Sequence, residues 1–124
     1  MTRDRKRVLV ADDDSGILES VRTALVDRGY EVLVAHDGAE ALSRAERDSP
    51  DLIVLDMVMP KRSGLSVLDR LHRNKGRTTP IILVSGNNDE RHRQYATSRG
   101  ADAYLAKPFD IDQLVDRVDT ILES

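Results

Sequence analysis

The stretch Asp51-Leu52-Ile53-Val54-Leu55-Asp56-Met57-Val58-Met59-Pro60 decides how the rest of this chain is arranged. Its apolar run over 52–55 is unbroken and stops at the carboxylate of Asp56. A short apolar run rich in branched side chains is typical of a strand buried on both faces. A charged residue that ends such a strand is expected at the carboxyl edge of the sheet, where open α/β sheets bind ligands. Asp56 is therefore our first candidate for a functional residue.

Composition limits the classes of protein that this chain can belong to. Its 124 residues are 40% hydrophobic but only 3% aromatic, so we expect one domain over 1–124 with an aliphatic core. The absence of Cys excludes disulfides and thiolate metal sites. No apolar run is long enough to cross a membrane, and the charged N-terminus precedes a strand rather than a signal-peptide core. The net charge of −3 argues against direct nucleic-acid binding. Because the chain has neither a membrane-spanning run nor a signal-peptide core, a cytoplasmic protein without membrane contact is expected.

Extended and helical patterns alternate along the chain. Besides 52–55, short apolar runs predict strands at 8–11, 32–35, 81–84 and 103–106. Each is followed by a segment that is helical by spacing or position, and the last one, over 111–122, has the clearest period. Five strands alternating with five helices predict an α/β fold with a parallel sheet covered on both faces. The leading topology is the flavodoxin-like, doubly wound (βα)5 sheet with strand order 2-1-3-4-5.

Two details of the helices are also predicted. Ser15 is expected to cap the first helix, with Asp14 close to its positive end, and Gly29 is expected to end it. The helix over 89–98 is poorly amphipathic, because only Tyr95 and Ala96 offer much apolar surface. Such a helix is weakly held and is a candidate for movement.

Polar residues follow the predicted strands where they end: Asp12 and Asp13 after the first, Asp56 after the third, Ser85 after the fourth and Lys107 after the fifth. Like charges this close repel by roughly 4 kcal/mol per pair at an effective dielectric of 20. A hard divalent cation removes that repulsion, and an all-oxygen, partly hydrated site suits Mg²⁺. A helix N-cap cluster would explain some of the acidic residues after the first strand, but not a carboxylate and a lysine at the ends of two other strands.

The same set of groups fits the acceptance of a phosphoryl group. An ionised aspartate is a nucleophile that can form an aspartyl-phosphate without a general base. Phosphoryl transfer needs mainly positioning and neutralisation of charge, which a metal ion and Lys107 can provide. Ser85 can donate a hydrogen bond to a phosphoryl oxygen, and Gly86 leaves the backbone open to approach.

These motifs, in this order, resemble the receiver domain of two-component response regulators. The resemblance rests on Asp12-Asp13, on 56–60 with Gly64, on Ser85, and on 104–109 (Tyr-Leu-Ala-Lys-Pro-Phe), and it covers essentially the whole chain. It implies that Asp56 is the phosphoacceptor and that Lys107 contacts the phosphoryl group. It also implies that Mg²⁺ is bound by Asp13 directly, by Asp12 largely through water, by Asp56, and by the backbone carbonyl of Val58. The bond Lys107–Pro108 would be a cis peptide.

The resemblance also implies a switch. Ser85 would swing toward the phosphate and Tyr104 would move inward, which changes the face formed by the fourth helix, the fifth strand and the fifth helix. Val58 and Asn87 stand where the family tunes the lifetime of the phosphoryl group. Val58 cannot hydrogen-bond an attacking water, so we expect a fairly long-lived phosphoryl group. Gly86 replaces the commoner Ala, which affects only the stiffness of that loop.

Partners follow from the same resemblance. The donor would be a sensor histidine kinase or a phosphotransfer protein, and the switched face would control an output partner or an output domain that the sequence does not identify. The chain ends directly after its last helix, as a single-domain regulator would, and a receiver cut from a longer protein would look the same. A monomer or a phosphorylation-dependent dimer is expected.

Other interpretations remain open at this point. An aspartyl-phosphate hydrolase of the haloacid dehalogenase type needs a second Asp two positions after the nucleophile, where this chain has Val58. A receiver-like interaction module that is not phosphorylated usually lacks an acidic-pair or Lys residue, and this chain keeps them all. Met57 and Met59 have the alternative of filling the core, which is the expectation for Met59, and Tyr104 has the alternative of a half-buried strand residue. Solvated side chains are expected for the histidines and for the basic residues of 70–77: His36, His72, His92, Arg70, Arg73, Lys75 and Arg77.

Overall fold

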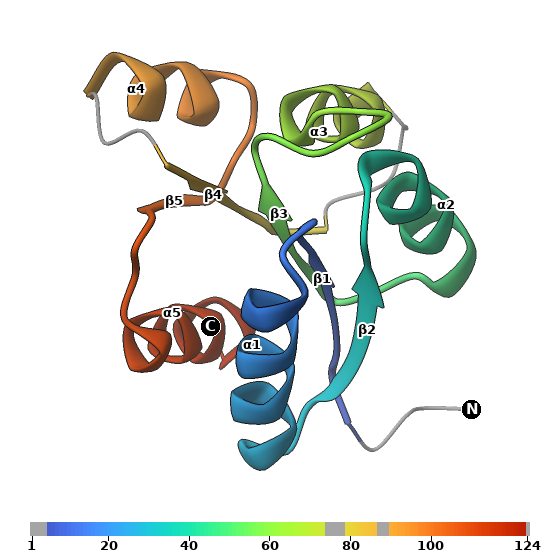
Figure 1. Cartoon of the computed structure of the whole chain (residues 1–124), viewed down its shortest axis with the longest axis vertical. Helices are drawn as coiled ribbons and strands as arrows, with labels where there is room; N and C mark the ends of the chain where they lie inside the picture. The colour runs from blue at the N-terminus through green and yellow to red at the C-terminus, as the bar shows by residue number, and fades with distance from the viewer. Residues whose placement is uncertain (1–4, 74–78, 87–89, 124) are drawn as a thin grey trace.

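The computed structural model describes residues 5–73, 79–86 and 90–123, except for the side chains of residues 73 and 92. Strands and helices alternate through these residues (Figure 1). Their bounds are β1 Arg7–Ala11, α1 Ser15–Asp27, β2 Glu31–Ala35, α2 Gly38–Asp48, β3 Leu52–Asp56, α3 Gly64–Arg73, β4 Ile81–Ser85, α4 Glu90–Ser98, β5 Ala103–Ala106 and α5 Ile111–Glu123. None of the described helices is long and apolar enough to span a membrane.

The strands form one parallel sheet with the order β2-β1-β3-β4-β5, which confirms the predicted flavodoxin-like topology. The register places Ala11 opposite Leu55 and Ser85 opposite Ala106. Every strand therefore ends at the same edge of the sheet. The residues that follow β1, β3, β4 and β5 are brought together there.

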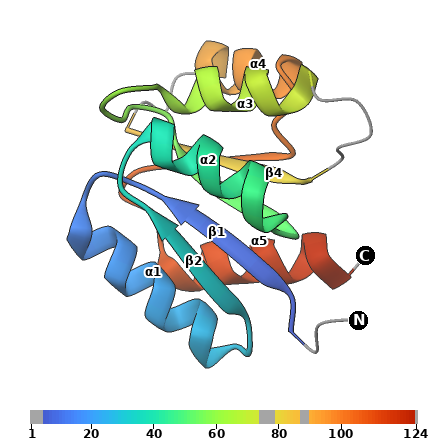
Figure 2. The same cartoon turned by 90° about the vertical axis from the view of Figure 1, so that its right-hand side faces the viewer.

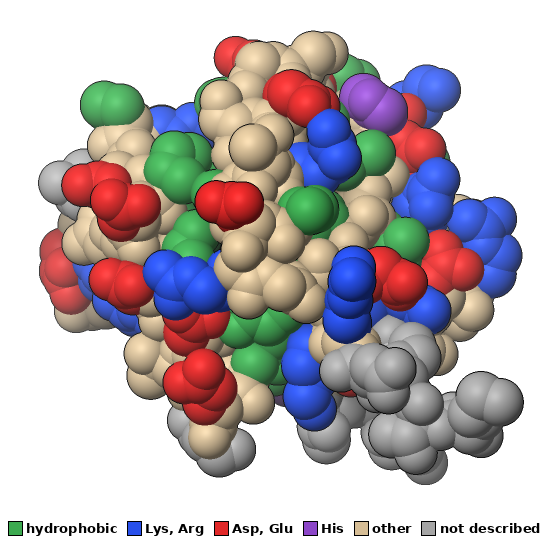
Figure 3. Space-filling model, turned by 90° about the horizontal axis from the view of Figure 1, so that it is seen from below, with side chains coloured by type: hydrophobic (Ala, Val, Ile, Leu, Met, Phe, Trp, Pro, Cys, Tyr) green, Lys and Arg blue, Asp and Glu red, His purple; other side chains and the backbone are tan. Residues whose placement is uncertain are grey.

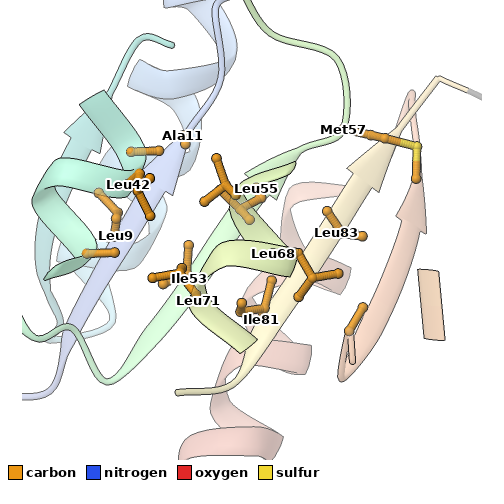
Figure 4. Packing of buried hydrophobic residues seen from close by; sticks show 14 of the residues in the cluster. Leu9, Ala11, Leu42, Ile53, Leu55, Met57, Leu68, Leu71, Ile81 and Leu83 are labelled. Atoms are coloured by element: carbon orange, nitrogen blue, oxygen red, sulfur yellow. The ribbon is translucent and has the colours of Figure 1, made fainter. Parts of the chain in front are cut away.

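Helices cover both faces of the sheet and give the molecule three layers. Figures 1 and 2 show α1 and α5 on one face and α2, α3 and α4 on the other. Alternate strand residues point to each face, so the core is divided in two by the sheet. Figure 4 shows Leu9, Ile53 and Leu83 of the sheet packed with Leu68 and Leu71 of α3. The buried side chains are almost all aliphatic, as the composition predicted.

The prediction that Ser15 caps α1 is wrong by one residue. The N-cap is Asp14, whose extended backbone lets its Oδ1 accept hydrogen bonds from the N–H groups of Gly16 at 2.9 Å and Ile17 at 3.1 Å. Ser15 is the first residue inside the helix. At the other end, Gly29 follows the last turn with a φ of +104°, as predicted for a glycine that ends the helix.

Helix α4 contributes little to the core. Ala96 is fully buried, but Tyr95, which we expected to pack inward, is 45% exposed. Its hydroxyl instead accepts a hydrogen bond from Arg99 at 2.6 Å, and the Arg99 guanidinium lies over its ring. Tyr95 therefore packs along the helix surface, which leaves α4 with even less apolar anchoring than its sequence indicates.

Other side chains lie where the simpler interpretations placed them. Met57 and Met59 are buried in the core, with Met57 labelled in Figure 4. His36 and His72 are exposed, whereas the side chain of His92 lies outside the described residues. The face drawn in Figure 3 intersperses acidic and basic side chains with apolar ones.

Gly64 is required by close backbone contact beneath Asp56, and a Gly64→Ala variant tests this. An added Cβ would lie 2.2 Å from the carbonyl oxygen of Asp56, so the backbone must move. We expect a loss of about 2 kcal/mol in the free energy of unfolding, measured by urea denaturation. The control is Gly86→Ala, because a Cβ there meets nothing within 4 Å. A Gly64→Ala variant as stable as Gly86→Ala would contradict this packing.

Candidate phosphoacceptor and metal site

The site is built from the carboxyl ends of four strands. Asp56 is the last residue of β3 and Ser85 is the last residue of β4, while Asp12 and Lys107 directly follow β1 and β5. Asp12, Asp56 and Ser85 are each no more than 5% exposed. Polar residues at such depth need partners or ligands, because burying an unpaired charge is costly. The predicted cluster is therefore present, and most of it is withdrawn from solvent.

Lys107 bridges the two buried carboxylates. Its Nζ lies 2.9 Å from Asp12 Oδ2 and 3.2 Å from Asp56 Oδ2. The other oxygen of each carboxylate accepts a backbone hydrogen bond: Asp12 Oδ1 from Asp14 N–H at 2.9 Å, and Asp56 Oδ1 from Val58 N–H at 3.3 Å. These contacts fix the orientation of both carboxylates and give the site one positive charge against three negative ones.

The pKa values of Asp56 and Lys107 are both raised, but for different reasons. Burial, followed by the nearby charge of Asp12, raises the pKa of Asp56 above its ordinary value, although Lys107 and the Val58 N–H partly oppose this. Burial by itself would lower the pKa of Lys107, but its hydrogen bonds to Asp12 and Asp56 outweigh burial and raise it. Lys107 is therefore firmly charged at neutral pH, and the site retains an excess of negative charge that favours a cation.

The donor atoms suit a hard divalent ion. One carboxylate oxygen from each of Asp12, Asp13 and Asp56 lies within 4.8 Å of the others, and Asp13 is exposed while the other two are buried. Around Mg²⁺, neighbouring ligand oxygens are about 3 Å apart and opposite ones about 4 Å, so the cluster would close on binding or reach the ion partly through water. All the donors are oxygens, which matches Mg²⁺ rather than a soft metal. The exposed side of the cluster leaves room for water ligands.

Backbone hydrogen bonds hold the loops that carry these residues. Met57 N–H donates to Val84 O at 2.8 Å, and Lys107 N–H donates to Ser85 O at 2.7 Å. Gly64 N–H donates to Met57 O at 2.9 Å, which ties the start of α3 to the end of β3. Each loop at the site is therefore attached to a neighbouring strand. The peptide bond between Lys107 and Pro108 is cis, the isomer that the resemblance implied.

The two residues expected to form the switch are both buried. Ser85 and Tyr104 are each 4% exposed, so Tyr104 is more deeply buried than a half-buried strand residue would be. The Arg93 guanidinium carbon lies 5.3 Å from the centre of the Tyr104 ring, and Arg93 also pairs with Glu90 at 3.5 Å. The structure thus has Tyr104 in an inward position with α4 above it.

Of the two residues expected to tune the lifetime of the phosphoryl group, the structure describes Val58 but not Asn87. The side chain of Val58 is directed outward and is 74% exposed, next to the carboxylate that its N–H contacts. It places an apolar group at the mouth of the site. Asn87 lies outside the described residues, so its predicted role is untested by the structure.

Sequence reasoning missed three features of this region. The contact between Arg93 and Tyr104 depends on how α4 is rotated against β5, and no pattern in the sequence reports that rotation. The close contact between Gly64 and Asp56 was indicated only by the presence of a glycine in the loop. A pocket beside Lys107 joins residues from α1 and α5 that no motif connects.

Comparison with known proteins identifies the class that this fold and site define. Residues 8–119 match the family described as response regulator receiver domain, and the chain belongs to that family. It is 41% identical over 116 residues to Response regulator MprA of Mycobacterium tuberculosis (strain H37Rv), an alignment that covers 94% of this chain and 50% of that protein. The chain thus spans about half the length of the curated relatives that it matches.

Solved structures show the same relationship. A Francisella response regulator receiver domain superposes with a TM-score of 0.92 at 36% identity, covering 96% of this chain and 98% of that one. A CheY-like receiver domain protein from Methanospirillum hungatei superposes with a TM-score of 0.89 at 30% identity, covering 97% and 95%. Receiver domains bind Mg²⁺ in an acidic pocket, and the cluster of Asp12, Asp13 and Asp56 provides such a pocket here.

Binding of Mg²⁺ should be visible as thermal stabilisation that depends on Asp13. An ion that binds only the folded state adds about 2.7 kcal/mol of stability at about 100 times its Kd, which raises the melting temperature by several degrees. We expect this shift in the wild type and in Asp27→Asn, an exposed acidic residue at the end of α1. Asp13→Asn should lose most of it. Equal shifts in the two variants would exclude Asp13 as a ligand.

Proposed function

We propose that this domain accepts a phosphoryl group on Asp56 with Mg²⁺ and thereby controls an output partner or domain. The single observation that carries the proposal is the position of Lys107. Its ammonium group lies between two buried carboxylates at the carboxyl edge of the sheet, one of which ends a strand. A lysine placed to compensate a buried nucleophile and an acidic metal cluster is the arrangement that phosphoryl transfer needs.

The protein's own groups account for the chemistry as follows. The Val58 N–H holds Asp56 Oδ1, which orients the carboxylate for attack on phosphorus. Lys107 then neutralises charge on the transferred group, and the hydroxyl of Ser85 donates a hydrogen bond to one of its oxygens. Bound Mg²⁺, held by Asp12, Asp13, Asp56 and the carbonyl of Val58, would supply further positive charge to the phosphoryl oxygens. No general base is required, because the carboxylate is already ionised.

The output signal is proposed to pass through Ser85 and Tyr104 to the face made by α4, β5 and α5. Helix α4 has little apolar anchoring, and its residue Arg93 rests on Tyr104. A change in the position of Ser85 next to the phosphoryl group would therefore act on a helix that is easily moved. A phosphorylation-dependent dimer through this face is one form that the output can take.

The donor is proposed to be a sensor histidine kinase or a phosphotransfer protein in the cytoplasm. Membership of the receiver family supports this proposal. The relatives that the chain matches are about twice its length, so an output domain on the same polypeptide is one form of the output.

A hydrolase gains no support from the site. The position two residues after Asp56 carries the exposed, apolar Val58, which has no group that can act as an acid or base. For the same reason we propose a long-lived phosphoryl group and only slow autodephosphorylation. Asn87 is proposed to tune that lifetime together with Val58.

The test uses a small acyl phosphate as the donor. The protein is incubated with acetyl phosphate and either Mg²⁺ or EDTA, and its intact mass is measured. We expect the gain of one phosphoryl group with Mg²⁺ and none with EDTA. No gain in the wild type with either acetyl phosphate or a histidine-phosphorylated donor would overturn the proposal.

A further inference from the structure

An open pocket of about 600 Å³ lies directly beside the phosphoacceptor site. This volume falls within the range of small-molecule binding sites. The pocket lies between the first turns of α1 and the turn from β5 into α5, two helices that are neighbours on one face of the sheet (Figure 1). The lining residues from α1 and its N-cap are Asp14, Gly16, Ile17 and Ser20, and those from the β5–α5 side are Lys107, Pro108, Phe109 and Ile111.

The walls of the pocket are mainly apolar. Ile17, Phe109 and Ile111 are partly buried and pack against the core of the α1 and α5 face, so they are held in place while still exposing apolar surface to the pocket. Gly16 adds no side chain to the wall of the pocket. The carboxylate of Asp14 is turned to the helix N-terminus, where its Oδ1 accepts two backbone hydrogen bonds.

Lys107 connects this pocket to the site of chemistry. It lines the pocket, and its Nζ also lies 3.2 Å from Asp56 Oδ2. Pro108 and Phe109 line the same pocket, so a donor whose phosphoryl group contacts Lys107 beside Asp56 can reach the pocket with the rest of its molecule. An apolar substituent on the donor would be removed from water there, which is favourable in proportion to the area buried.

We propose that this pocket binds the apolar acyl group of small-molecule acyl phosphates, so that the domain prefers donors with an acyl group larger than acetyl. This inference rests on the proposed function, because it concerns the donor for Asp56. In the reaction a carboxylate oxygen of Asp56 forms a bond to phosphorus, and the bond between phosphorus and the acyl oxygen breaks. The electron pair of that bond leaves with the carboxylate product, so charge and atoms balance without a proton transfer.

Butyryl phosphate is the probe, compared with acetyl phosphate. Butyrate and acetate are almost equally good leaving groups, so a difference in rate reports contacts with the longer chain. Its two additional methylene groups, half buried in an open pocket, should raise the second-order rate constant for phosphorylation about fourfold, since full burial is worth about 0.8 kcal/mol for each. The rate constants are obtained from the time course of intact mass with Mg²⁺ present.

Two matched variants test whether the preference for butyryl phosphate arises in this pocket. Ser20→Phe places a ring in the pocket from an exposed helical position, and we expect the ratio of the butyryl to the acetyl rate constant to fall to about one. Ser43→Phe makes the same change at an exposed position on α2, on the other face of the sheet, and should keep the wild-type ratio.

The outcomes separate this inference from the proposed function. A wild-type ratio near one, with normal phosphorylation by acetyl phosphate, would overturn the inference alone. A raised ratio that survives in Ser20→Phe would also overturn it, because the preference would then arise elsewhere. Failure of both acyl phosphates to modify the wild type would overturn this inference, and the proposed function would fall with it only if a histidine-phosphorylated donor also failed.

Discussion

The Asp56→Asn variant is expected to gain no phosphoryl group from any donor and yet to unfold at a higher temperature than the wild type without metal. The loss of modification follows because an amide cannot act as the nucleophile. The gain in stability follows because the variant removes one of two buried negative charges that lie close together. At an effective dielectric of 20 that repulsion amounts to roughly 4 kcal/mol, of which the loss of the contact with Lys107 cancels a part.

The pH dependence of this gain has a definite sign. The pKa of Asp56 is raised in the folded state, so the folded protein binds this proton more tightly than the unfolded chain does. The charge on Asp56 therefore does not destabilise the folded protein below the ordinary pKa of an aspartate. The destabilisation grows as the pH rises from that value through the raised pKa of Asp56. We expect the stability difference between Asp56→Asn and the wild type to increase from pH 4 toward neutrality and then to level off. A difference that shrinks as the pH rises would contradict the burial and charge described for Asp56.

The second large effect is expected for Lys107→Met, which keeps the length of the side chain but removes its charge. Two buried carboxylates then lose their shared cation, and breaking a buried ion pair from one side costs about 3–5 kcal/mol. The loss should be largest near pH 8 and smaller near pH 5, where Asp56 can take up a proton. Added Mg²⁺ should restore part of the stability, because the metal replaces the missing positive charge.

Lys61→Met is the control for this effect. Lys61 also contacts a carboxylate, that of Asp37 at 3.7 Å, but its side chain is 70% exposed. Exposed ion pairs are worth at most about 1 kcal/mol, so the control should lose little. Chemical denaturation of both variants in EDTA gives the comparison. Equal losses would show that Lys107 is an ordinary surface residue and not the centre of the site.

The fold was predictable because buried strands, and the polar residues that end them, have recognisable sequence patterns. The run over 52–55 is apolar at every position because helices cover both faces of β3, and Asp56 is the residue at which this strand ends. Once the strand order is known, the residues after β1, β3, β4 and β5 must lie at one edge. The meeting of Asp12, Asp56 and Lys107 therefore follows from topology and not from their spacing along the chain.

What the sequence left open depends on local dihedrals and on helix rotation. Asp14 and Ser15 are both good N-cap residues, and only the extended backbone of Asp14 decides between them. Tyr95 is apolar enough to be buried, but the rotation of α4 turns it to the surface and gives the inward place to Ala96. The pocket beside Lys107 depends on how closely α1 and α5 approach each other, which no single segment determines.

The most direct test of the account is the chemical identification of the modified residue. The protein is phosphorylated with acetyl phosphate and Mg²⁺, reduced with borohydride, which converts an aspartyl-phosphate to homoserine, and then digested and sequenced by mass spectrometry. We expect homoserine at position 56 and unchanged aspartate at positions 12 and 13. Reduction at either of those positions, or the absence of homoserine from a protein that had gained the phosphoryl mass, would contradict it.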